Sequence, residues 1–144
     1  IISVIPDWWG GRDLSSSVPK LFLIHFNPTC FVAEQNKRFI GFLIGFLSHA
    51  RTDEGYIHFV GVDPGSRKKG VAKRLYHKFF EVCRQHSRSI VRSCTAPENR
   101  LSIAFHQKMG FKIEPGNRRV NGVPVTEKYL HQNDLKVLFK KELT

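Results

Sequence analysis

The residues best suited to chemistry lie between Val62 and Ala72, where the sequence reads Val-Asp-Pro-Gly-Ser-Arg-Lys-Lys-Gly-Val-Ala. An apolar run ends at Val62, and an amphipathic run begins after Gly70. A strand that leads through such a loop into a helix directs unpaired backbone N–H groups at one point, where the helix dipole also favours an anion. The segment therefore predicts a site for a diphosphate group.

The residue types in this loop match the needs of such a site. Arg67, Lys68 and Lys69 add cationic side chains. Gly70 allows the backbone to approach a ligand closely, and Ala72 keeps the first helical turn free of bulk. The competing interpretation is a solvated basic turn that happens to contain glycines.

The elements around the loop follow from the spacing of apolar residues. Runs rich in β-branched and aromatic residues predict strands, and apolar residues repeating every three to four positions predict helices. The strands before the loop form a predicted antiparallel meander. In chain order the expected elements are strands 30–34, 39–47 and 56–62, a helix 71–86, a strand 89–94, a helix 98–109, and closing strands 123–130 and 136–140.

The second predicted helix has a specific apolar face. Leu101, Phe105 and Met109 are spaced to form one stripe along it. Gly110 follows directly and is expected to adopt the left-handed conformation that ends many helices.

The first 30 residues carry weaker signals. The stretch 6–11 contains Pro, Asp and two Gly, so it predicts a turn after an apolar opening. Trp8 and Trp9 lie in it, and they are expected to form either a flap over the core or a wall of a substrate pocket. Ser15 to Phe26 predicts a short helix with a serine cap.

Bulk composition limits the classes of protein. The 144 residues, 41% of them apolar, predict a single domain over 1–144. The longest apolar run, 39–47, is far shorter than the roughly 20 residues of a membrane-spanning helix. Three widely spaced cysteines predict no disulfide framework, no metal site and a cytoplasmic location. The chain opens at Ile1 without a signal peptide, which leaves open that its first element is truncated.

Two motifs resemble those of the GNAT superfamily of N-acetyltransferases. Arg67-x-x-Gly70-x-Ala72 resembles the family's Gln/Arg-x-x-Gly-x-Gly/Ala signature, preceded by Val62-x-Pro64 where the family commonly has Val-x-Pro. The segment from Pro97-x-Asn99 to Ala104-Phe105-His106-x-Lys108-x-Gly110-Phe111 resembles its second hallmark. The two occur in the family's order and separation, and the resemblance covers roughly residues 31–130.

The resemblance implies an α/β (α+β) fold with a mixed, mostly antiparallel central sheet that splays between its fourth and fifth strands and is flanked by helices. The splay is expected between the strand ending near Val62 and the strand at 89–94. The implied co-substrate is acetyl-coenzyme A (acetyl-CoA), without a metal. The residues implied to bind it are Val60 and Val62 through their backbone, Arg67, Lys68, Lys69, Gly70, Val71, Ala72 and Lys73 around the diphosphate, and Asn99 and His106 along the coenzyme arm.

The implied reaction is direct transfer of the acetyl group to a primary amine of a small molecule, peptide or protein. The backbone N–H near Val60 is expected to hold the oxyanion, and an acid to protonate the leaving thiolate. His106 stands where the family most often has the tyrosine acid, and it donates a proton when cationic or when a neutral tautomer directs an N–H at sulfur. A core histidine that fills space is the alternative.

The sequence defines the general base of the implied reaction less clearly than the acid. Tyr56 stands where many members have a glutamate, which leaves Asp53, Glu54 and His58 as nearby substitutes. Tyr56 and His58, together with Trp8 and Trp9, are the candidate acceptor-binding residues. Cys94 suggests a covalent acyl-enzyme only weakly, because a lone strand cysteine is usually a small buried hydrophobe.

Two other functions compete with acetyl transfer. A net charge of +11 favours anionic partners and is compatible with a nucleic-acid-associated protein, including an RNA-directed acetyltransferase. Against this, much of the charge lies in 67–74, and no aromatic-basic interleaving resembles a base-stacking platform. The other alternative is a non-catalytic acyl-CoA sensor. The predicted assembly is a monomer or homodimer with no membrane partner.

Overall fold

The computed structural model describes all residues from Ile1 to Thr144. Their contacts gather in two compact units, Ile1–Arg88 and Ser89–Thr144. No helix combines the length and apolar character that a membrane crossing requires.

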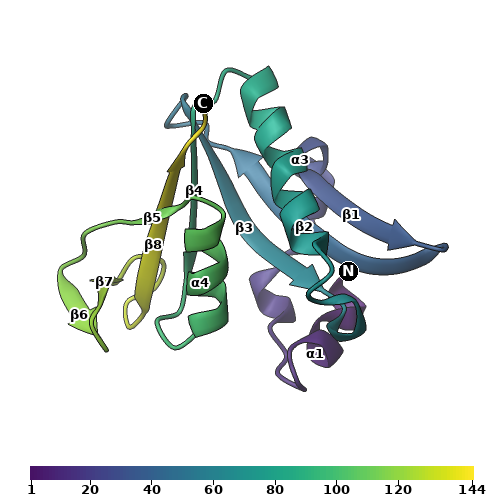
Figure 1. Cartoon of the computed structure of the whole chain (residues 1–144), viewed down its shortest axis with the longest axis horizontal. Coiled ribbons are helices and arrows are strands. Elements are labelled where there is room, and N and C mark those ends of the chain that lie inside the picture. Colours follow the sequence, from purple (N-terminus) through teal and green to yellow (C-terminus); the bar gives the residue numbers. More distant parts are fainter. The chain divides into compact units, whose positions relative to one another are not determined.

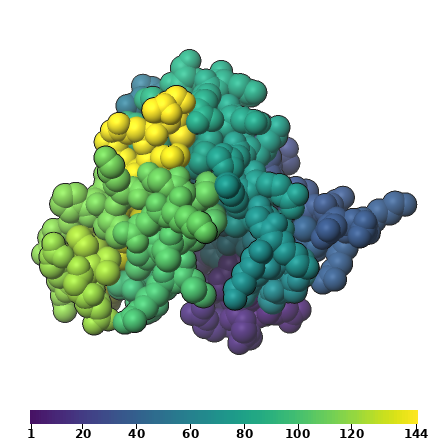
Figure 2. Space-filling model, viewed as in Figure 1, coloured from purple at the N-terminus to yellow at the C-terminus, as the bar shows by residue number.

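The first unit is built on the predicted meander. Strands β1 (Cys30–Gln35), β2 (Arg38–Leu47) and β3 (Glu54–Val62) pair antiparallel in chain order. Asn36 and Lys37 form the two-residue turn between β1 and β2, both at positive φ, as hairpin turns of this length require. This turn projects from the unit (Figures 1 and 2).

Helix α3 (Val71–Gln85) covers one face of this meander (Figure 1). The predicted helix is confirmed, and its apolar face lies on the sheet. Gly45 of β2 permits this packing, because a Cβ there would lie 2.5 Å from the ring of Phe79. Phe79 itself is fully buried.

The opposite face of the sheet is covered by the first 30 residues. Short helical segments follow one another there: η1 (Ile2–Val4), α1 (Ile5–Trp8), η2 (Ser15–Ser17), α2 (Lys20–His25) and η3 (Asn27–Thr29). Their core cluster contains Ile5, Trp8 and Val18 packed with Phe42 and Ile44 of β2. Residues 42 and 44 alternate with Gly45 along the strand, so they point to the other side.

The turn predicted at 6–11 is wrong in its first half. Pro6 lies in the first turn of α1, where its fixed φ and missing N–H cost nothing. The helix predicted to run to about Phe26 is confirmed in its second half, because α2 ends at His25, whereas Ser15–Ser17 form a separate 3-10 turn.

The second unit is an antiparallel arrangement around its last strand. β8 (Leu135–Glu142) pairs with β4 (Ile90–Thr95), with β5 (Lys112–Ile113) and with β7 (Val123–Glu127), and β6 (Arg118–Val120) pairs with β7. The predicted closing strands are therefore confirmed, while β5 and β6 are additional to the predicted elements. Together the two units give the predicted mixed α/β class with mostly antiparallel strands.

Helix α4 (Arg100–Lys108) of this unit corrects the predicted stripe. Leu101 is 86% exposed, and the buried residues are Ile103 and His106. Ile103 and His106 are three residues apart and share a face, whereas Leu101 lies on the opposite side. The predicted glycine cap is confirmed, since Gly110 has φ +89 and the N–H of Phe111 donates to the carbonyl of His106 at 2.9 Å.

Candidate functional site

The predicted strand–loop–helix segment is present in the first unit. β3 ends at Val62, the 3-10 turn η4 (Pro64–Ser66) follows, and α3 begins at Val71. The buried Asp63 fixes the turn, because its carboxylate accepts from Arg38 Nη2 at 2.6 Å and from Ser66 Oγ at 3.4 Å. Spacing and residue type alone do not identify Asp63 as the residue that orders this loop.

The start of α3 has the features of an anion site. Gly70 is its N-cap residue, at φ +79, and provides no side-chain cap. The first intrahelical bond at this end runs from Arg74 N–H to the Gly70 carbonyl at 3.1 Å, so the N–H groups of residues 71–73 have no partner within the helix. The first turn contains no acidic residue, and the exposed Lys68, Lys69 and Lys73 surround it. An anion bound here would satisfy the N–H groups and reduce the repulsion among the lysines.

The side chain of Arg67 is held by two backbone carbonyls. Its Nε donates to the carbonyl of Val62 at 3.1 Å, and its Nη2 donates to the carbonyl of Trp8 at 2.6 Å. The guanidinium therefore ties the loop to the end of β3 and to α1. Two of its donors thus have a structural role, and the predicted contact with phosphate would use the remaining N–H groups of the guanidinium.

Replacing Arg67 is expected to reduce stability. In an Arg67→Lys variant the single ammonium cannot span both carbonyls as the planar guanidinium does. The free energy of unfolding should fall by about 1 kcal/mol in urea titration, whereas the exposed Lys69→Ala control should change it by less than about 0.5 kcal/mol. Equal stability of Arg67→Lys and the wild type would show that the two hydrogen bonds of the guanidinium do not stabilise the loop.

The backbone of β3 presents the groups predicted to contact the coenzyme arm. Asp63 N–H donates to the Ile40 carbonyl of β2 at 2.8 Å. Hydrogen-bonded and non-hydrogen-bonded pairs alternate along antiparallel strands, so the N–H and C=O groups of Val60 and Val62 point away from β2. Arg67 occupies the Val62 carbonyl, which leaves the Val60 groups and the Val62 N–H as the better candidates.

The candidate acceptor residues of β3 lie two and four positions before Val60. A bulge in the β2–β3 register pairs Ile44 with Phe59 and Gly45 with Ile57, so that His58 is the extra residue. The Nε2 of His58 lies 2.6 Å from the carbonyl of Ser17, and its ring contacts Phe22. Tyr56 stacks on Phe46.

The two tryptophans belong to the core face of the first unit. Trp8 is 8% exposed and stacks on Phe39 and Phe42. Trp9 is half-buried and lies against Phe42 and Phe59. These contacts favour the interpretation of a flap over the core, with Trp9 the better placed of the two to reach a ligand.

The second unit holds the other two predicted coenzyme residues, both on α4. Asn99 is the N-cap of α4, and its Oδ1 accepts from Ser102 N–H at 3.2 Å. This is the ordinary stabilising role of an N-terminal asparagine. The side-chain amide nitrogen is therefore the part of Asn99 that could contact a ligand.

The surroundings of His106 are those of a core residue. It is 4% exposed and stacks on Phe139, with ring centroids 4.2 Å apart. Its Nδ1 lies 2.7 Å from the Ser102 carbonyl, and because a carbonyl only accepts, Nδ1 carries the hydrogen of the neutral ring. Burial lowers the pKa of His106 to about 4. The ring thus lacks both the charge and the Nε2 hydrogen needed by the predicted acid, so its surroundings do not favour that role.

The buried His106 is expected to make stability depend on pH. Its pKa in the folded chain is below the ordinary histidine value of 6.5, so the unfolded chain binds the proton more tightly. Its contribution is complete above about pH 6.5 and is lost as pH falls toward 4, amounting to about 3 kcal/mol.

A His106→Phe variant keeps an aromatic ring in this position and should lack the pH-dependent loss. Urea titrations at pH 7 and pH 4 measure the difference, and parallel curves for both proteins would rule out a neutral buried histidine. Thiol release at saturating substrates tests the acid role separately, since removal of a general acid typically costs roughly 10²- to 10⁴-fold.

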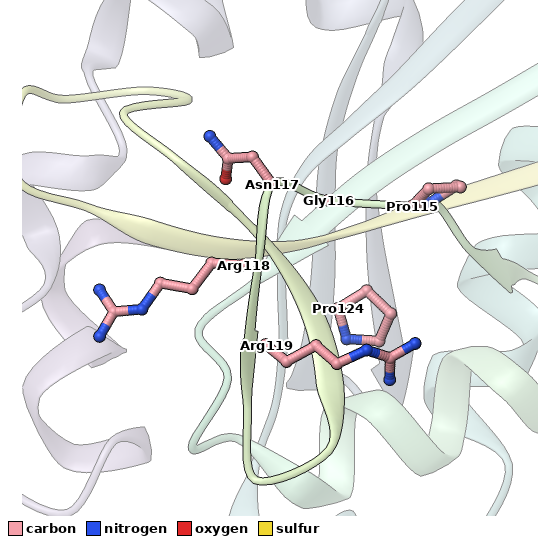
Figure 3. A pocket seen from close by; sticks show the side chains of 6 residues that line it. All are labelled: Pro115, Gly116, Asn117, Arg118, Arg119 and Pro124. Atoms are coloured by element: carbon pink, nitrogen blue, oxygen red, sulfur yellow. The ribbon is translucent and has the colours of Figure 1, made fainter.

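Two surface depressions lie in the second unit. One, of about 300 Å³, is lined by the start of the β6–β7 hairpin (Figure 3). Arg118 and Arg119 extend to opposite sides there, and their guanidinium groups are held by Glu127 Oε1 at 3.1 Å and the Gly122 carbonyl at 2.8 Å. The other, of about 480 Å³, is lined by Lys128, Leu130, His131 and Gln132. Neither includes a predicted site residue.

The cysteines and metal-ligating side chains form no site. Cys30, Cys83 and Cys94 are free thiols, and no group of three or more His, Cys, Asp and Glu side chains could hold a metal ion. Burial raises the pKa of Cys83 to about 12, so this thiol is a poor nucleophile.

Comparisons with known proteins agree with the two motifs. An L-2,4-diaminobutyric acid acetyltransferase of Marinococcus halophilus is 32% identical over 105 residues, covering 71% of this chain and 60% of that protein. This chain thus spans about three fifths of that relative. Ard1 from Thermoplasma volcanium superposes with a TM-score of 0.77 at 20% identity, covering 97% of this chain and 87% of that one.

A further solved structure, yncA from Salmonella typhimurium with its cofactor acetyl-CoA, gives a TM-score of 0.68 at 14% identity, over 94% of this chain and 78% of that one. Because both sequence identities are low, the two solved structures establish the fold of this chain and nothing more. The sequence also matches the Acetyltransferase (GNAT) family over residues 4–111. The chain belongs to the GNAT family of acetyltransferases.

Proposed function

We propose that this chain is an acyl-CoA-dependent N-acetyltransferase that moves the acetyl group of acetyl-CoA directly to a primary amine. The observation that carries the proposal is the start of α3, with its uncapped N–H groups, its glycine N-cap and three exposed lysines. Membership of the GNAT family supplies the reaction class.

The loop and the first turn of α3 are the proposed diphosphate site. The backbone N–H groups of residues 71–73 donate to the phosphate oxygens, and Lys68, Lys69 and Lys73 neutralise their charge. Arg67 supports this site indirectly, because its side chain holds the loop against β3 and α1. Together these groups position the thioester end of the co-substrate along β3.

The acetyl transfer is proposed to take place beside the middle of β3. Acetyl-CoA supplies an activated acyl group whose carbonyl is open to attack by a neutral amine. The Val60 N–H, directed away from β2, stabilises the negative charge that develops on the carbonyl oxygen. His106 remains outside this step because of its buried, neutral ring.

The acceptor is proposed to be a small amine that carries a carboxylate. The support is the named activity of the Marinococcus relative, L-2,4-diaminobutyric acid acetyltransferase. Peptide and protein amines are the alternatives, and the family relatives give no support to a nucleic-acid-binding protein or a non-catalytic sensor.

Release of free thiol tests this proposal. The chain is incubated with acetyl-CoA and a panel of primary amines that includes L-2,4-diaminobutyrate, cadaverine and peptides with a free N-terminus. We expect thiol release that needs both acetyl-CoA and an amine, fastest with the diamino acid. Binding of acetyl-CoA without turnover across the panel would leave the chain as a sensor, and the absence of binding would end the proposal.

A further inference from the structure

His58 combines an unusual backbone position with a fixed ring. It is the extra residue of the β2–β3 bulge, two residues before Val60. A bulge turns its side chain away from the regular alternation of the strand. The ring is half-buried and is held between the Ser17 carbonyl, at 2.6 Å from Nε2, and the ring of Phe22, at 4.9 Å between centroids.

The contact with Ser17 defines the protonation of the ring. A carbonyl oxygen only accepts hydrogen bonds, so Nε2 must carry a hydrogen. In the neutral ring the lone pair is then on Nδ1, which makes no hydrogen bond within the protein. The partner on one nitrogen thus leaves the other ready to accept a proton, the arrangement of histidines that act as bases.

We infer that His58 is the general base of the reaction, accepting at Nδ1 the proton of the incoming ammonium group. The inference rests on the acetyl transfer proposed above. Two residues along a strand span about 7 Å, which leaves room for an amine, or an amine and one water, between His58 and the Val60 N–H.

The proton and bond changes balance as follows. Nδ1 of His58 takes one proton from the acceptor ammonium, which leaves a neutral amine. Its lone pair forms the C–N bond to the acetyl carbon, the C–S bond breaks, and coenzyme A leaves as a thiolate. The nitrogen then loses its second proton, which passes through water to the thiolate, so that the products are the N-acetyl amide and the free thiol of coenzyme A. The imidazolium keeps its Nε2–H bond to the Ser17 carbonyl, which is stronger in the charged form, and then returns its proton to water.

The other base candidates of this region are less well placed. Glu54 begins β3, is 8% exposed and forms an ion pair with Arg51 at 3.5 Å. Asp53 lies in the exposed β2–β3 turn, and Tyr56 is stacked on Phe46. His58 alone has a ring held by a partner that leaves a lone pair for the substrate.

The groups that touch His58 carry no charge: they are Ser17, Phe22 and Phe59. The titratable side chains on the elements that contact it are Lys20 and His25 on α2, both exposed, and Glu54 and Tyr56 on β3. A pH dependence of the rate that disappears when His58 is replaced can therefore be assigned to this ring.

The test compares His58→Gln with the wild type and with His49→Gln, which changes an exposed histidine in the β2–β3 turn. The glutamine amide can still donate to the Ser17 carbonyl but cannot accept a proton at neutral pH. We expect kcat to fall on the order of 100-fold, acetyl-CoA affinity to be retained and the acidic limb of the kcat/KM profile to disappear. His49→Gln should behave as the wild type.

Chemical rescue separates a base from a structural residue. Imidazole should restore part of the activity of His58→Ala, because it supplies the missing proton acceptor. An unchanged rate and pH profile in His58→Gln would overturn the inference, and so would a rate loss that keeps the acidic limb and is not rescued. An inactive wild type that binds acetyl-CoA would instead count against the proposed function itself.

Discussion

A Gly70→Asp variant is expected to bind acetyl-CoA on the order of 1000-fold more weakly than the wild type. The new carboxylate would stand at the N-terminus of α3, where the proposed diphosphate lies, and its repulsion over about 4 Å costs roughly 4 kcal/mol at an effective dielectric constant near 20. The φ of +79 at this position also disfavours any residue with a Cβ. Titration calorimetry gives the two affinities.

Gly122→Asp is the matched control for this experiment. Gly122 has the same φ of +79, and at both glycines a Cβ would have no atom within 4 Å. The control therefore carries the same backbone strain and the same charge, but in the β6–β7 turn. Similar losses of affinity in both variants would mean that strain or net charge, rather than the site at α3, explains the effect.

A Phe79→Ala variant is expected to lower the free energy of unfolding by about 3–5 kcal/mol. The Phe79 ring is fully buried between α3 and the meander. Its removal leaves a cavity under α3, the helix whose first turn forms the proposed diphosphate site. Urea titration measures the loss, and a change below about 1 kcal/mol would be incompatible with this packing.

The glycine beneath Phe79 offers a second, independent measurement. A Cβ on Gly45 would lie 2.5 Å from Phe79 Cε2 and 3.0 Å from the Tyr56 carbonyl, so Gly45→Ala should be destabilising on its own. In a Phe79→Leu background the ring clash is relieved, and the double variant should be more stable than the sum of the single losses predicts. Additive losses would exclude direct contact at this position.

Much of the fold follows from local patterns in the sequence. The meander and α3 are predictable because their apolar residues repeat with the periods of strand and helix. The hairpin of β6 and β7 is absent from the predicted elements although its signal is present: Asn121-Gly122 between Val120 and Val123 is a strong two-residue turn sequence, and both residues have positive φ.

The errors have identifiable physical causes. Proline breaks regular structure in most positions, but the first turn of a helix tolerates it, as at Pro6. The stripe through Leu101 follows from the period alone, but the face that α4 buries is set by the strands against which it packs. His106 is buried on that face although histidine is a polar residue.

The positions of the site residues depend on partners that the sequence does not place. The residue type of Arg67 predicts a phosphate contact, but the carbonyl of Trp8, 59 residues away, holds its side chain. The carbonyl of Ser17 fixes the ring of His58 across 41 residues. Such backbone partners carry no signal in residue type, so only the three-dimensional arrangement reveals them.

The proposed catalysis depends above all on the binding of the acetyl-CoA diphosphate at the start of α3. Titration calorimetry with acetyl-CoA and with S-acetylpantetheine, which has the thioester and the pantetheine arm but lacks the diphosphate and the nucleotide, tests this binding most directly. We predict binding of acetyl-CoA on the order of micromolar and binding of S-acetylpantetheine at least about 100-fold weaker. Equal affinities for the two compounds, or no binding of acetyl-CoA, would show that this site does not hold the diphosphate.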